Sequence, residues 1–570
     1  MSPLDWIVLA VTLSGIITYG LYKSKTTKNL EGYFLSNRSF SSSLILLSVM
    51  GTQASAVTFL SAPGQAYTDG MRFVQYYLGL PLAMVVLCIT FVPIFHKLKV
   101  YTAYEYLEKR FDSKTRTFTA GLFLLQRGLS TGISIYAPSI ILSSLFGWNI
   151  YLTNIFMGGL LIIYTVSGGA RAVAYTQQFQ FIIIILGMVT AACMVVHLLP
   201  DGVGLMDTLR VSGRLGKLNV ITSGVKEQGF DWSDRYNIWS GLIGGFFLAL
   251  SYFGTDQSQV GRYLTARSVA ESRLGLLLNG MIKVPMQFCI LLVGALIFTF
   301  YQFNQAPLSF NQSMVEKVSA TPKADSLRHM QAEYSALSEQ KRELVHSFIR
   351  GHQQGMVDEA VSAELKKVNA ATDQLRTHFK TMARNTVAGD ANDTNYIFLR
   401  FVVDYMPKGL VGLLIAIIFL AAWGSIAAAL NSLASSTVVD IHKKFFQKGG
   451  CTDREDYSIS KWYTLGWGIF SIAVAQFAGN AGSLIELVNI LGSLFYGVIL
   501  GIFLVAFYCK NIYGNATFWS AVLVEGVVMI LFWQSDLGFL WLNVIGAVGV
   551  VLASYLLHAT LFSKRLSAKT

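Results

Sequence analysis

Long apolar runs recur along almost the whole chain and are separated by polar stretches. A helix needs about 20 mostly apolar residues to cross the hydrocarbon core of a bilayer. The chain contains about thirteen such runs, a pattern that predicts an all-α polytopic membrane protein. The predicted spans are 4–22, 42–68, 72–96, 117–147, 150–168, 173–198, 236–262, 273–302, 395–440, 459–479, 482–509, 514–533 and 538–562. The ninth is long enough to bend, or to begin with a helix outside the membrane.

The composition and the cysteines favour a membrane protein over a set of soluble domains. Of the 570 residues, 53% are hydrophobic and only 13% are charged, whereas soluble domains carry about 25% charged residues. The five cysteines form no C-x-x-C pair, so neither a zinc site nor a redox dithiol is predicted. The first apolar run begins almost at once and lacks a basic leader, which favours a retained span over a cleaved signal.

The net charge of +12 is explained by basic residues that gather in alternate loops. Because lysine and arginine favour cytoplasmic loops, this distribution places the N-terminus outside and the C-terminus in the cytoplasm of an inner or plasma membrane. The predicted inner loops contain Lys23–Lys28 with Arg38, Lys97–Arg116, Arg171, Arg262–Arg273, Lys443–Lys461, Lys510 and Lys564–Lys569. The short outer loops near positions 148, 480 and 535 contain no basic residue.

One polar segment, 303–394, separates a first membrane domain (1–302) from a second (395–570). Its apolar residues recur at helical spacing in two runs, and Gly351 and Gly355 lie between them. This pattern predicts an extracytoplasmic helical hairpin. The hairpin is interpreted either as a decoration of the membrane domain or as an element that binds a protein partner or gates transport.

Charged side chains inside the predicted spans are candidates for function, because charge at bilayer depth is costly and usually faces a cavity. Arg127, Asp256 and Lys283 lie in the fourth, seventh and eighth spans. The structural alternative is an internal ion pair that holds helices together. Glu486 is close enough to the end of a span to be solvated, and Glu525 is a further candidate.

Two spans carry small and polar residues at their centres, where a continuous helix would expose polar groups to lipid. These segments are Met50–Phe59 in the second span and Ser251–Gln259 in the seventh. Interrupted spans at matching positions of two halves indicate a transporter site, with free carbonyls for a cation and helix ends for a substrate. Each opens a group of five spans, which predicts a 5+5 inverted repeat. Close packing of small residues is the alternative explanation.

The ninth span contributes a third element of this kind, Ala421–Ser432, whose small residues allow a neighbouring helix to approach closely. Ser425 offers a hydroxyl oxygen there. Sodium is a hard cation that prefers oxygen ligands, and carbonyls of a broken helix with hydroxyls of a neighbour would provide them. The alternative is a packing face without a ligand.

Several motifs resemble the sodium:solute symporter family over nearly the whole chain outside 303–394. The matching stretches are Ser55-Ala56 through Phe59 with Ala62-Pro63, Tyr101–Phe111, Thr131–Pro138, Tyr164–Gly169 with Ala172-Val173, Phe253-Gly254 with Gln257 and Arg262, and Leu430–Ser432. The second and third stretches are most similar to the iodide, monocarboxylate and vitamin branch. The resemblance implies a leucine-transporter-type fold, with one helix before the repeats and two after them, and sodium-driven uptake by alternating access.

The resemblance also implies a sodium site, near which the chain departs from the family pattern. The implied ligands are the backbone carbonyls of Gly51, Ala54 and Ala421, the Ser425 hydroxyl, and a second hydroxyl whose position is taken by Gly424. Many relatives have an aspartate where this chain has Gln177, and a second sodium site needs a hydroxyl where it has Ala428. These departures count against a second sodium ion. Asp256 is a candidate to compensate, near the cation or as a proton carrier.

The implied substrate site lies between the two broken spans. Its candidate residues are Gln53, Thr58, Tyr76, Tyr77, Arg127, Tyr252, Asp256 and Lys283. Lys283 falls where the galactose branch has its substrate-binding lysine, and Tyr252 matches the aromatic inner gate of that branch. The sugar-binding glutamate of that branch corresponds to Tyr77, which disfavours a hexose. Lys283 and Arg127 suit an anionic substrate through charge-assisted hydrogen bonds, so a carboxylate is favoured.

The function predicted from the sequence is therefore sodium-coupled uptake of a small organic solute, with sodium as the coupling ion and no other cofactor. One alternative couples transport to protons through Asp256. Another is a membrane sensor or scaffold that contacts a protein partner through 303–394. An enzyme and a nucleic-acid-binding protein are disfavoured, because no nucleophile–base pair or metal-ligand cluster is evident and the basic residues follow the membrane topology.

Overall fold

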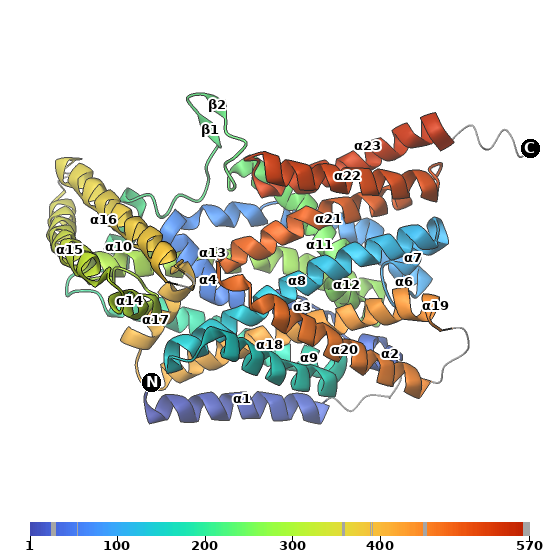
Figure 1. Ribbon diagram of the computed structural model, residues 1–570, viewed down its shortest axis with the longest axis horizontal. Helices are drawn as coiled ribbons and strands as arrows, with labels where there is room; N and C mark the ends of the chain where they lie inside the picture. Colours follow the sequence, from blue (N-terminus) through green and yellow to red (C-terminus); the bar gives the residue numbers. More distant parts are fainter. Residues whose placement is uncertain are drawn as a thin grey trace, which may run out of the picture.

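The computed structural model describes residues 1–23, 30–53, 55–355, 359–387, 389, 391–447, 453–480 and 482–562. Long helices run side by side along the longest axis of the molecule and form one bundle (Figure 1). Two further helices, α15 (Ala324–Gln353) and α16 (Glu359–Thr386), stand at the end of the bundle where the N-terminus lies (Figure 1).

The helices of the first half precede α14 in the chain. They are α1 (Pro3–Lys23), α2 (Leu30–Leu35), α3 (Ser42–Gln53), α4 (Ala56–Asp69), α5 (Leu80–Val86), α6 (Val92–Leu98), α7 (Glu105–Arg110), α8 (Ser113–Phe146), α9 (Ile150–His197), α10 (Leu205–Arg214), α11 (Gly245–Thr255), α12 (Gln257–Leu264) and α13 (Val269–Phe303). Besides α15 and α16, the second half contains α14 (Gln312–Ser319), α17 (Ile397–Tyr405), α18 (Leu410–Ser436), α19 (Lys443–Phe445), α20 (Asp453–Ala475), α21 (Leu484–Tyr508), α22 (Gly514–Gln534) and α23 (Phe539–Leu557).

The apolar runs form helices because a backbone in lipid can satisfy its polar groups only within its own segment. Among the described residues, eight helices are long and apolar enough to cross a membrane, and four shorter apolar helices of 10–17 residues accompany them. The expectation of a multi-pass α-helical membrane protein is thus confirmed. The count of thirteen spans and the 5+5 repeat stay predictions. The expected spans 150–168 and 173–198 lie within one helical element, α9.

Both expected helix breaks are present. Between α3 and α4, Ser55 has an extended backbone with φ −78° and ψ 164°. Between α11 and α12, Asp256 is extended with φ −75° and ψ 118°. The long ninth span is divided as well, since α17 forms a separate helix before α18. The breaks therefore place free backbone groups inside the bundle, where they need partners.

The segment 199–235 adds a feature that an all-α fold does not contain. β1 (Val225–Lys226) and β2 (Gly229–Phe230) pair antiparallel and form a short hairpin that projects from the bundle (Figure 1). Gly229 has a φ of +105°, a conformation that side-chain-bearing residues rarely adopt. Strands of two residues are too short to leave an alternating pattern in the sequence.

Helices α15 and α16 lie within the segment 303–394, where the sequence predicts a helical hairpin, and they pack against each other (Figure 1). Of the apolar residues at helical spacing in this segment, some are buried and others are only half-buried. The buried ones are Leu327, Met330, Tyr334, Leu365, Val368 and Phe379, and the half-buried ones are Leu337, Leu344, Phe348, Val361 and Leu375. The apolar spacing therefore predicted only part of the buried face. The extracytoplasmic position of the hairpin stays a prediction.

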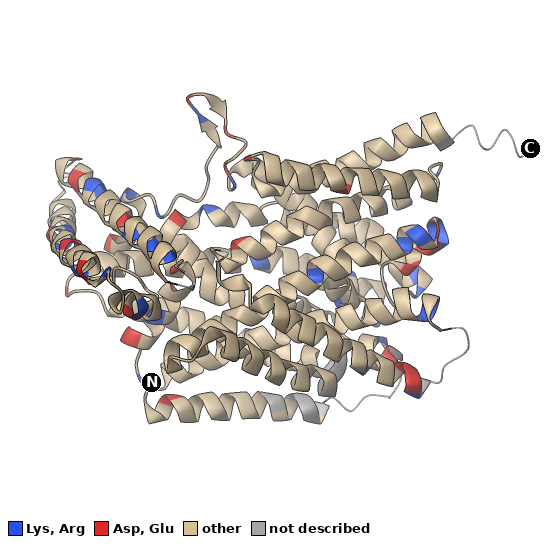
Figure 2. Cartoon of the chain, in the orientation of Figure 1, with Lys and Arg blue, Asp and Glu red and all other residues tan. Residues whose placement is uncertain are grey.

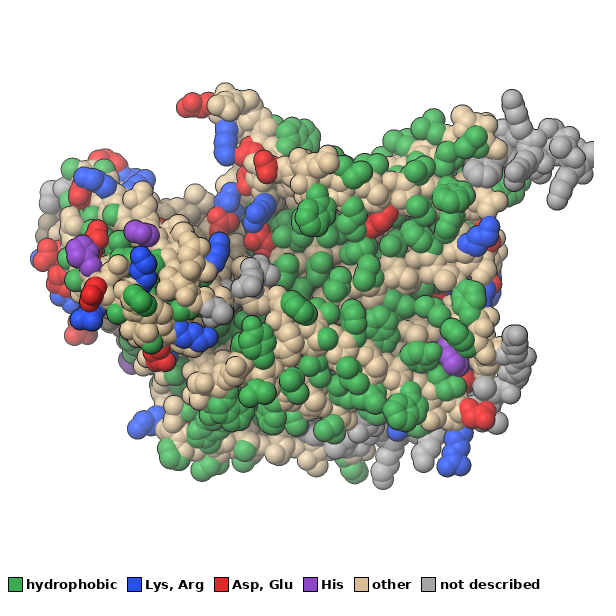
Figure 3. All heavy atoms as spheres, viewed as in Figure 1, with side chains coloured by type: hydrophobic (Ala, Val, Ile, Leu, Met, Phe, Trp, Pro, Cys, Tyr) green, Lys and Arg blue, Asp and Glu red, His purple; other side chains and the backbone are tan. Residues whose placement is uncertain are grey.

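Charges divide the molecule into zones. Lys, Arg, Asp and Glu lie mainly on α15, α16 and the two ends of the bundle, and few lie along its middle (Figure 2). Hydrophobic side chains cover the middle of the visible face (Figure 3). Glu486, which the sequence placed near the end of a span, forms an ion pair with Arg235 at 2.5 Å. The apolar middle zone is the surface that suits lipid.

Candidate functional site

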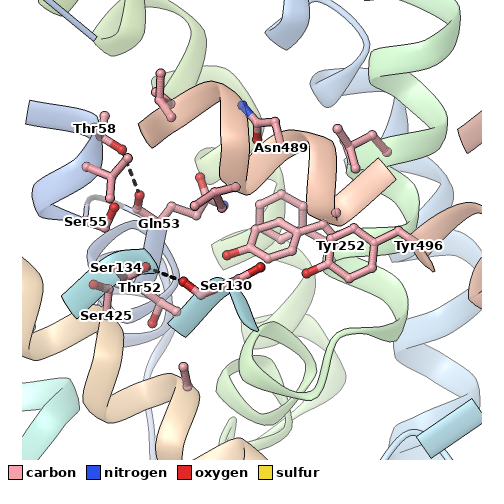
Figure 4. A pocket seen from close by; sticks show the side chains of 18 of the residues that line it. Thr52, Gln53, Ser55, Thr58, Ser130, Ser134, Tyr252, Ser425, Asn489 and Tyr496 are labelled. Carbon is pink, nitrogen blue, oxygen red and sulfur yellow. Dashed lines mark hydrogen bonds between the residues drawn. The ribbon is translucent and has the colours of Figure 1, made fainter. Parts of the chain in front are cut away.

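A cavity lies beside the break between α3 and α4 and extends along α11 (Figure 4). It contains about 1060 Å³ of empty space, including its open mouth, and helices α8, α13, α18 and α21 complete its wall. It brings together seven of the predicted substrate residues, namely Gln53, Thr58, Tyr76, Tyr77, Arg127, Tyr252 and Lys283. Ser425, predicted as a sodium ligand, lines the same cavity.

Lys283 is the most unusual charge at this site. Its side chain comes from the middle of α13 and is buried, with only 2% of the residue exposed. The ammonium nitrogen lies 5.6 Å from the centre of the Tyr77 ring, a weak cation–π contact. Among the described residues, no acidic side chain forms an ion pair with Lys283. Within the described part of the chain, the charge of this lysine is therefore not balanced by a direct ion pair.

Arg127 and Asp256 form a second charged group at the edge of the cavity. Their side chains approach to 3.8 Å. The Asp256 carboxylate also accepts a hydrogen bond from the Tyr496 hydroxyl at 2.6 Å and one from the backbone N–H of Ser258 at 2.7 Å, which caps α12. Arg127 lines the cavity, whereas Asp256 lies behind the lining. The structure thus gives Asp256 the partners of an ion pair and a helix cap.

Aromatic side chains line the cavity. Tyr252 and Tyr496 lie together, with ring centres 5.8 Å apart (Figure 4). The Gln259 amide donates to the Tyr252 hydroxyl at 2.7 Å. The rings of Tyr76 and Tyr77 also line the cavity and meet edge to face at 4.6 Å. These rings give the cavity apolar surfaces with hydroxyls at their edges.

A row of polar side chains on α8 forms a further wall, which the sequence predictions above do not include. Gln126, Ser130 and Ser134 are four residues apart and therefore share one face of the helix. The Ser134 hydroxyl donates to the Ser130 carbonyl at 2.9 Å (Figure 4). The Gln126 amide donates to the Ser130 hydroxyl at 3.0 Å. The spacing of polar residues in an apolar span is the signal that could have revealed this wall.

The described candidate sodium ligands lie on α3 and α18, and α18 packs against both α3 and α4. Gly51 lies in the last turn of α3, and Ala54 lies outside the described residues. In α18, the Ser425 hydroxyl donates to the Ala421 carbonyl at 3.0 Å, so its oxygen lone pairs stay available. The Thr58 hydroxyl donates across the helix break to the Gln53 carbonyl at 3.3 Å (Figure 4).

Gly424 provides no hydroxyl, but another oxygen comes close to its position. A Cβ added to Gly424 would lie 2.6 Å from Oε1 of Gln180, a buried residue of α9. The oxygen atoms available to a cation near the break thus belong to neutral carbonyl, hydroxyl and amide groups in buried surroundings. Hard cations prefer such oxygen ligands. The residues present therefore fit a sodium ion.

The comparisons with known proteins show the family of the chain. The profile of the sodium:solute symporter family matches residues 33–309 and 375–523, and its gap falls within the insertion. The rabbit (Oryctolagus cuniculus) sodium-dependent multivitamin transporter is 26% identical, over 90% of this chain and 67% of its own length. The sodium/sialic acid symporter SiaT of Proteus mirabilis is 25% identical, over 96% of this chain and 94% of its own length.

A solved structure of a Na⁺-coupled sialic acid symporter, substrate-bound and open to the outside, shares the fold. It superimposes with a TM-score of 0.75 at 23% identity and covers 98% of both chains. The chain belongs to the sodium:solute symporter family. It is a multi-pass membrane protein of a class that transports solutes with sodium as the coupling ion.

Proposed function

We propose that this transporter takes up a small organic anion, most suitably a carboxylate, together with sodium, by alternating access. The observation that carries the proposal is Lys283, a buried cation in the cavity without an acidic partner among the described residues. An unpaired charge inside a membrane protein is costly and usually faces a ligand. A substrate carboxylate would accept a charge-assisted hydrogen bond from the ammonium group and balance its charge.

The rest of the cavity suits the polar body of such a solute. The Nε2 group of Gln53 and the Oε1 atom of Gln126 are buried without a hydrogen-bond partner among the described residues. One is a donor and the other an acceptor, so together they match a hydroxyl or an amide. Tyr76, Tyr77 and Tyr252 supply apolar faces against the carbon skeleton.

The shared wall of the two sites supports coupling between ion and substrate. Ser425 belongs to the candidate sodium ligands and also lines the substrate cavity. Gln53 and Thr58 lie on either side of the helix break, so ordering of this break would position both for the substrate. Coupling requires that ion and substrate favour the same closed state, so that each raises the affinity for the other.

Two relatives support the choice of a carboxylate. SiaT is named for sialic acid and a Xenopus laevis relative, 23% identical, is named for monocarboxylates. Both names describe carboxylate-bearing solutes. Sialic acid and lactate are therefore the first solutes to test.

The test measures uptake of radiolabelled sialic acid and lactate into proteoliposomes that contain the purified full-length protein. An inward sodium gradient should drive accumulation of at least one of them, and choline should not. Lys283→Met keeps the length of the side chain and removes its charge. It should lower uptake at low substrate by at least about tenfold, because a hydrogen bond to a charged group contributes about 1.5–3 kcal/mol.

Lys341→Met is the matched control, because Lys341 is equally buried but lies in α15, outside the cavity. Its uptake should equal that of the unchanged protein. Unaltered uptake by Lys283→Met would contradict the carboxylate assignment. Accumulation driven by an inward proton gradient in sodium-free buffer, and lost in Asp256→Asn, would contradict sodium coupling and favour proton coupling.

A further inference from the structure

Gln177 of α9 is completely buried and joins three helices through its side-chain amide. Its Nε2 group donates to the Thr52 hydroxyl oxygen of α3 at 3.2 Å and to the Gly424 carbonyl oxygen of α18 at 3.1 Å. Its Oε1 atom accepts a hydrogen bond from the Ser48 hydroxyl of α3 at 3.0 Å. The amide is therefore fully engaged next to the candidate sodium ligands.

The surroundings of this amide leave no spare room. A Cβ added to Gly51 would lie 2.8 Å from the Cβ atom of Gln177, and one added to Gly424 would lie 3.1 Å from its Cγ atom. Real Cβ atoms rarely approach so closely, so both positions suit glycine. The glycines let α3 and α18 approach α9 until the amide contacts both. Local packing thus fixes the amide nitrogen between two oxygens.

We propose that the Gln177 amide permanently fills a cation position, so that this transporter binds one sodium ion and not two. An amide N–H₂ group carries partial positive charge and bonds to hydroxyl and carbonyl oxygens, as a monovalent cation does. It links α3 and α18 to α9 without an ion. That the transporter binds one sodium ion rests on the proposed sodium site at the α3–α4 break. That the Gln177 amide fills a cation position does not depend on that site.

A single isosteric change should turn this position into a cation site. Gln177→Glu keeps the shape of the side chain but replaces the donor by a second carboxylate oxygen. That oxygen would face the Gly424 carbonyl, which cannot donate a hydrogen bond, and the Thr52 hydroxyl, which donates to the Ser48 carbonyl at 2.8 Å. Buried oxygens that face one another without a proton are strongly unfavourable. A bound cation would relieve this repulsion.

The experiment is thermal unfolding of the detergent-purified full-length protein at pH 8, with sodium replaced by choline at constant ionic strength. A ligand that binds only the folded state raises the unfolding temperature in proportion to the logarithm of the ligand concentration. The slope of this dependence grows with the number of binding sites, so two sites give about twice the slope of one. The unchanged protein should show the slope of one site. Gln177→Glu should be less stable in choline and show about twice that slope in sodium. Gln177→Met, similar in size but neutral, should be less stable with the unchanged slope.

Gln287→Glu controls for burial of any carboxylate, because Gln287 is also completely buried and lies in α13. Its slope should equal that of the unchanged protein. The inference is overturned if Gln177→Glu keeps the one-site slope, if Gln287→Glu doubles it too, or if the unchanged protein already has the two-site slope. If Gln177→Glu does not fold, the sodium slope of the unchanged protein tests the proposal: a one-site slope supports it and a two-site slope overturns it. If sodium raises the unfolding temperature of Gln177→Glu but not that of the unchanged protein, the result would support a cation position filled by the Gln177 amide and contradict the proposed sodium site.

Discussion

At the scale of the residue, the buried charges differ in whether the protein balances them. Asp393, where the insertion returns to the bundle, is fully buried and pairs with Arg376 at 2.5 Å and Lys380 at 2.6 Å. The backbone N–H of Phe310 also donates to it at 2.9 Å. Lys283 has no acidic partner of this kind in the described ranges, and its proposed role in substrate binding rests on that difference. Paired charges hold elements together, whereas an unpaired one awaits a ligand.

The Asp393 pair predicts a dependence of stability on pH. Burial alone would raise the pKa of Asp393, but the charges of Arg376 and Lys380, with hydrogen bonds from Lys380 and Phe310, lower it to about 2. The pKa in the unfolded chain is about 3.9. The carboxylate therefore contributes about 2–3 kcal/mol of stability above pH 4, which is lost as the pH falls towards 2.

The measurement is thermal unfolding of the unchanged protein and of Asp393→Asn between pH 2 and 7. The variant should be less stable at pH 7 by about 3–5 kcal/mol, because it leaves buried cations unpaired. This difference should shrink below pH 4. Asp325→Asn is the control, since that side chain is 90% exposed. A stability difference that is the same at every pH would contradict the electrostatic role of Asp393.

At the scale of the element, the insertion is joined to α4, the helix that follows the first break. Tyr67 of α4 receives a hydrogen bond from the Arg376 guanidinium of α16 at 3.5 Å. Gly64 of α4 lies directly against the Thr394 carbonyl, so close that a Cβ there would be 1.9 Å from the oxygen. The end of the insertion thus packs on the helix that borders the cavity, and substitutions at this contact should affect α4.

Gly64→Ala should therefore destabilise the protein by about 1–3 kcal/mol, the usual cost of overpacking, because α4 or the backbone at Thr394 must move. The unfolding temperature measures this effect. Gly159→Ala in α9 is the control, since nothing lies within 4 Å of a Cβ at that position. Equal unfolding temperatures for the two variants would show that α4 is not held by the insertion.

At the scale of the whole molecule, the predicted orientation can be tested, because segments predicted to face opposite sides of the membrane lie at opposite ends of the bundle. The N-terminus, α15 and α16 lie at one end, and α7 and α19 lie at the other (Figure 1). Basic side chains cluster near α7 and α19 (Figure 2). Since basic residues favour the cytoplasmic side, the end with α7 and α19 is predicted to face the cytoplasm.

Cysteine labelling in intact cells tests this orientation in a background without the natural cysteines. Gln340→Cys on α15 and Lys114→Cys at the start of α8 both replace exposed residues. A membrane-impermeant maleimide should label the first in intact cells and the second only after permeabilisation. The reverse pattern would invert the predicted topology.

The sequence by itself determined that the chain is a multi-pass α-helical membrane protein and where two of its helices break. Apolar length and small polar residues act locally, so the breaks at Ser55 and Asp256 could be predicted. The candidate substrate residues came from the family resemblance, and seven of them line one cavity. The hairpin of β1 and β2 could not be predicted, because its strands are too short to show a pattern.

Only the tertiary structure decided which polar groups are partners. Asp256 is a candidate ligand by sequence, but the fold places it behind the cavity wall with Arg127 and Tyr496. In the sequence, Gln177 is noticeable only because many relatives have an aspartate at this position. The fold places its amide between α3 and α18. The physical reason is that hydrogen bonds depend on distances of a few tenths of an ångström between helices, which packing sets and local sequence does not.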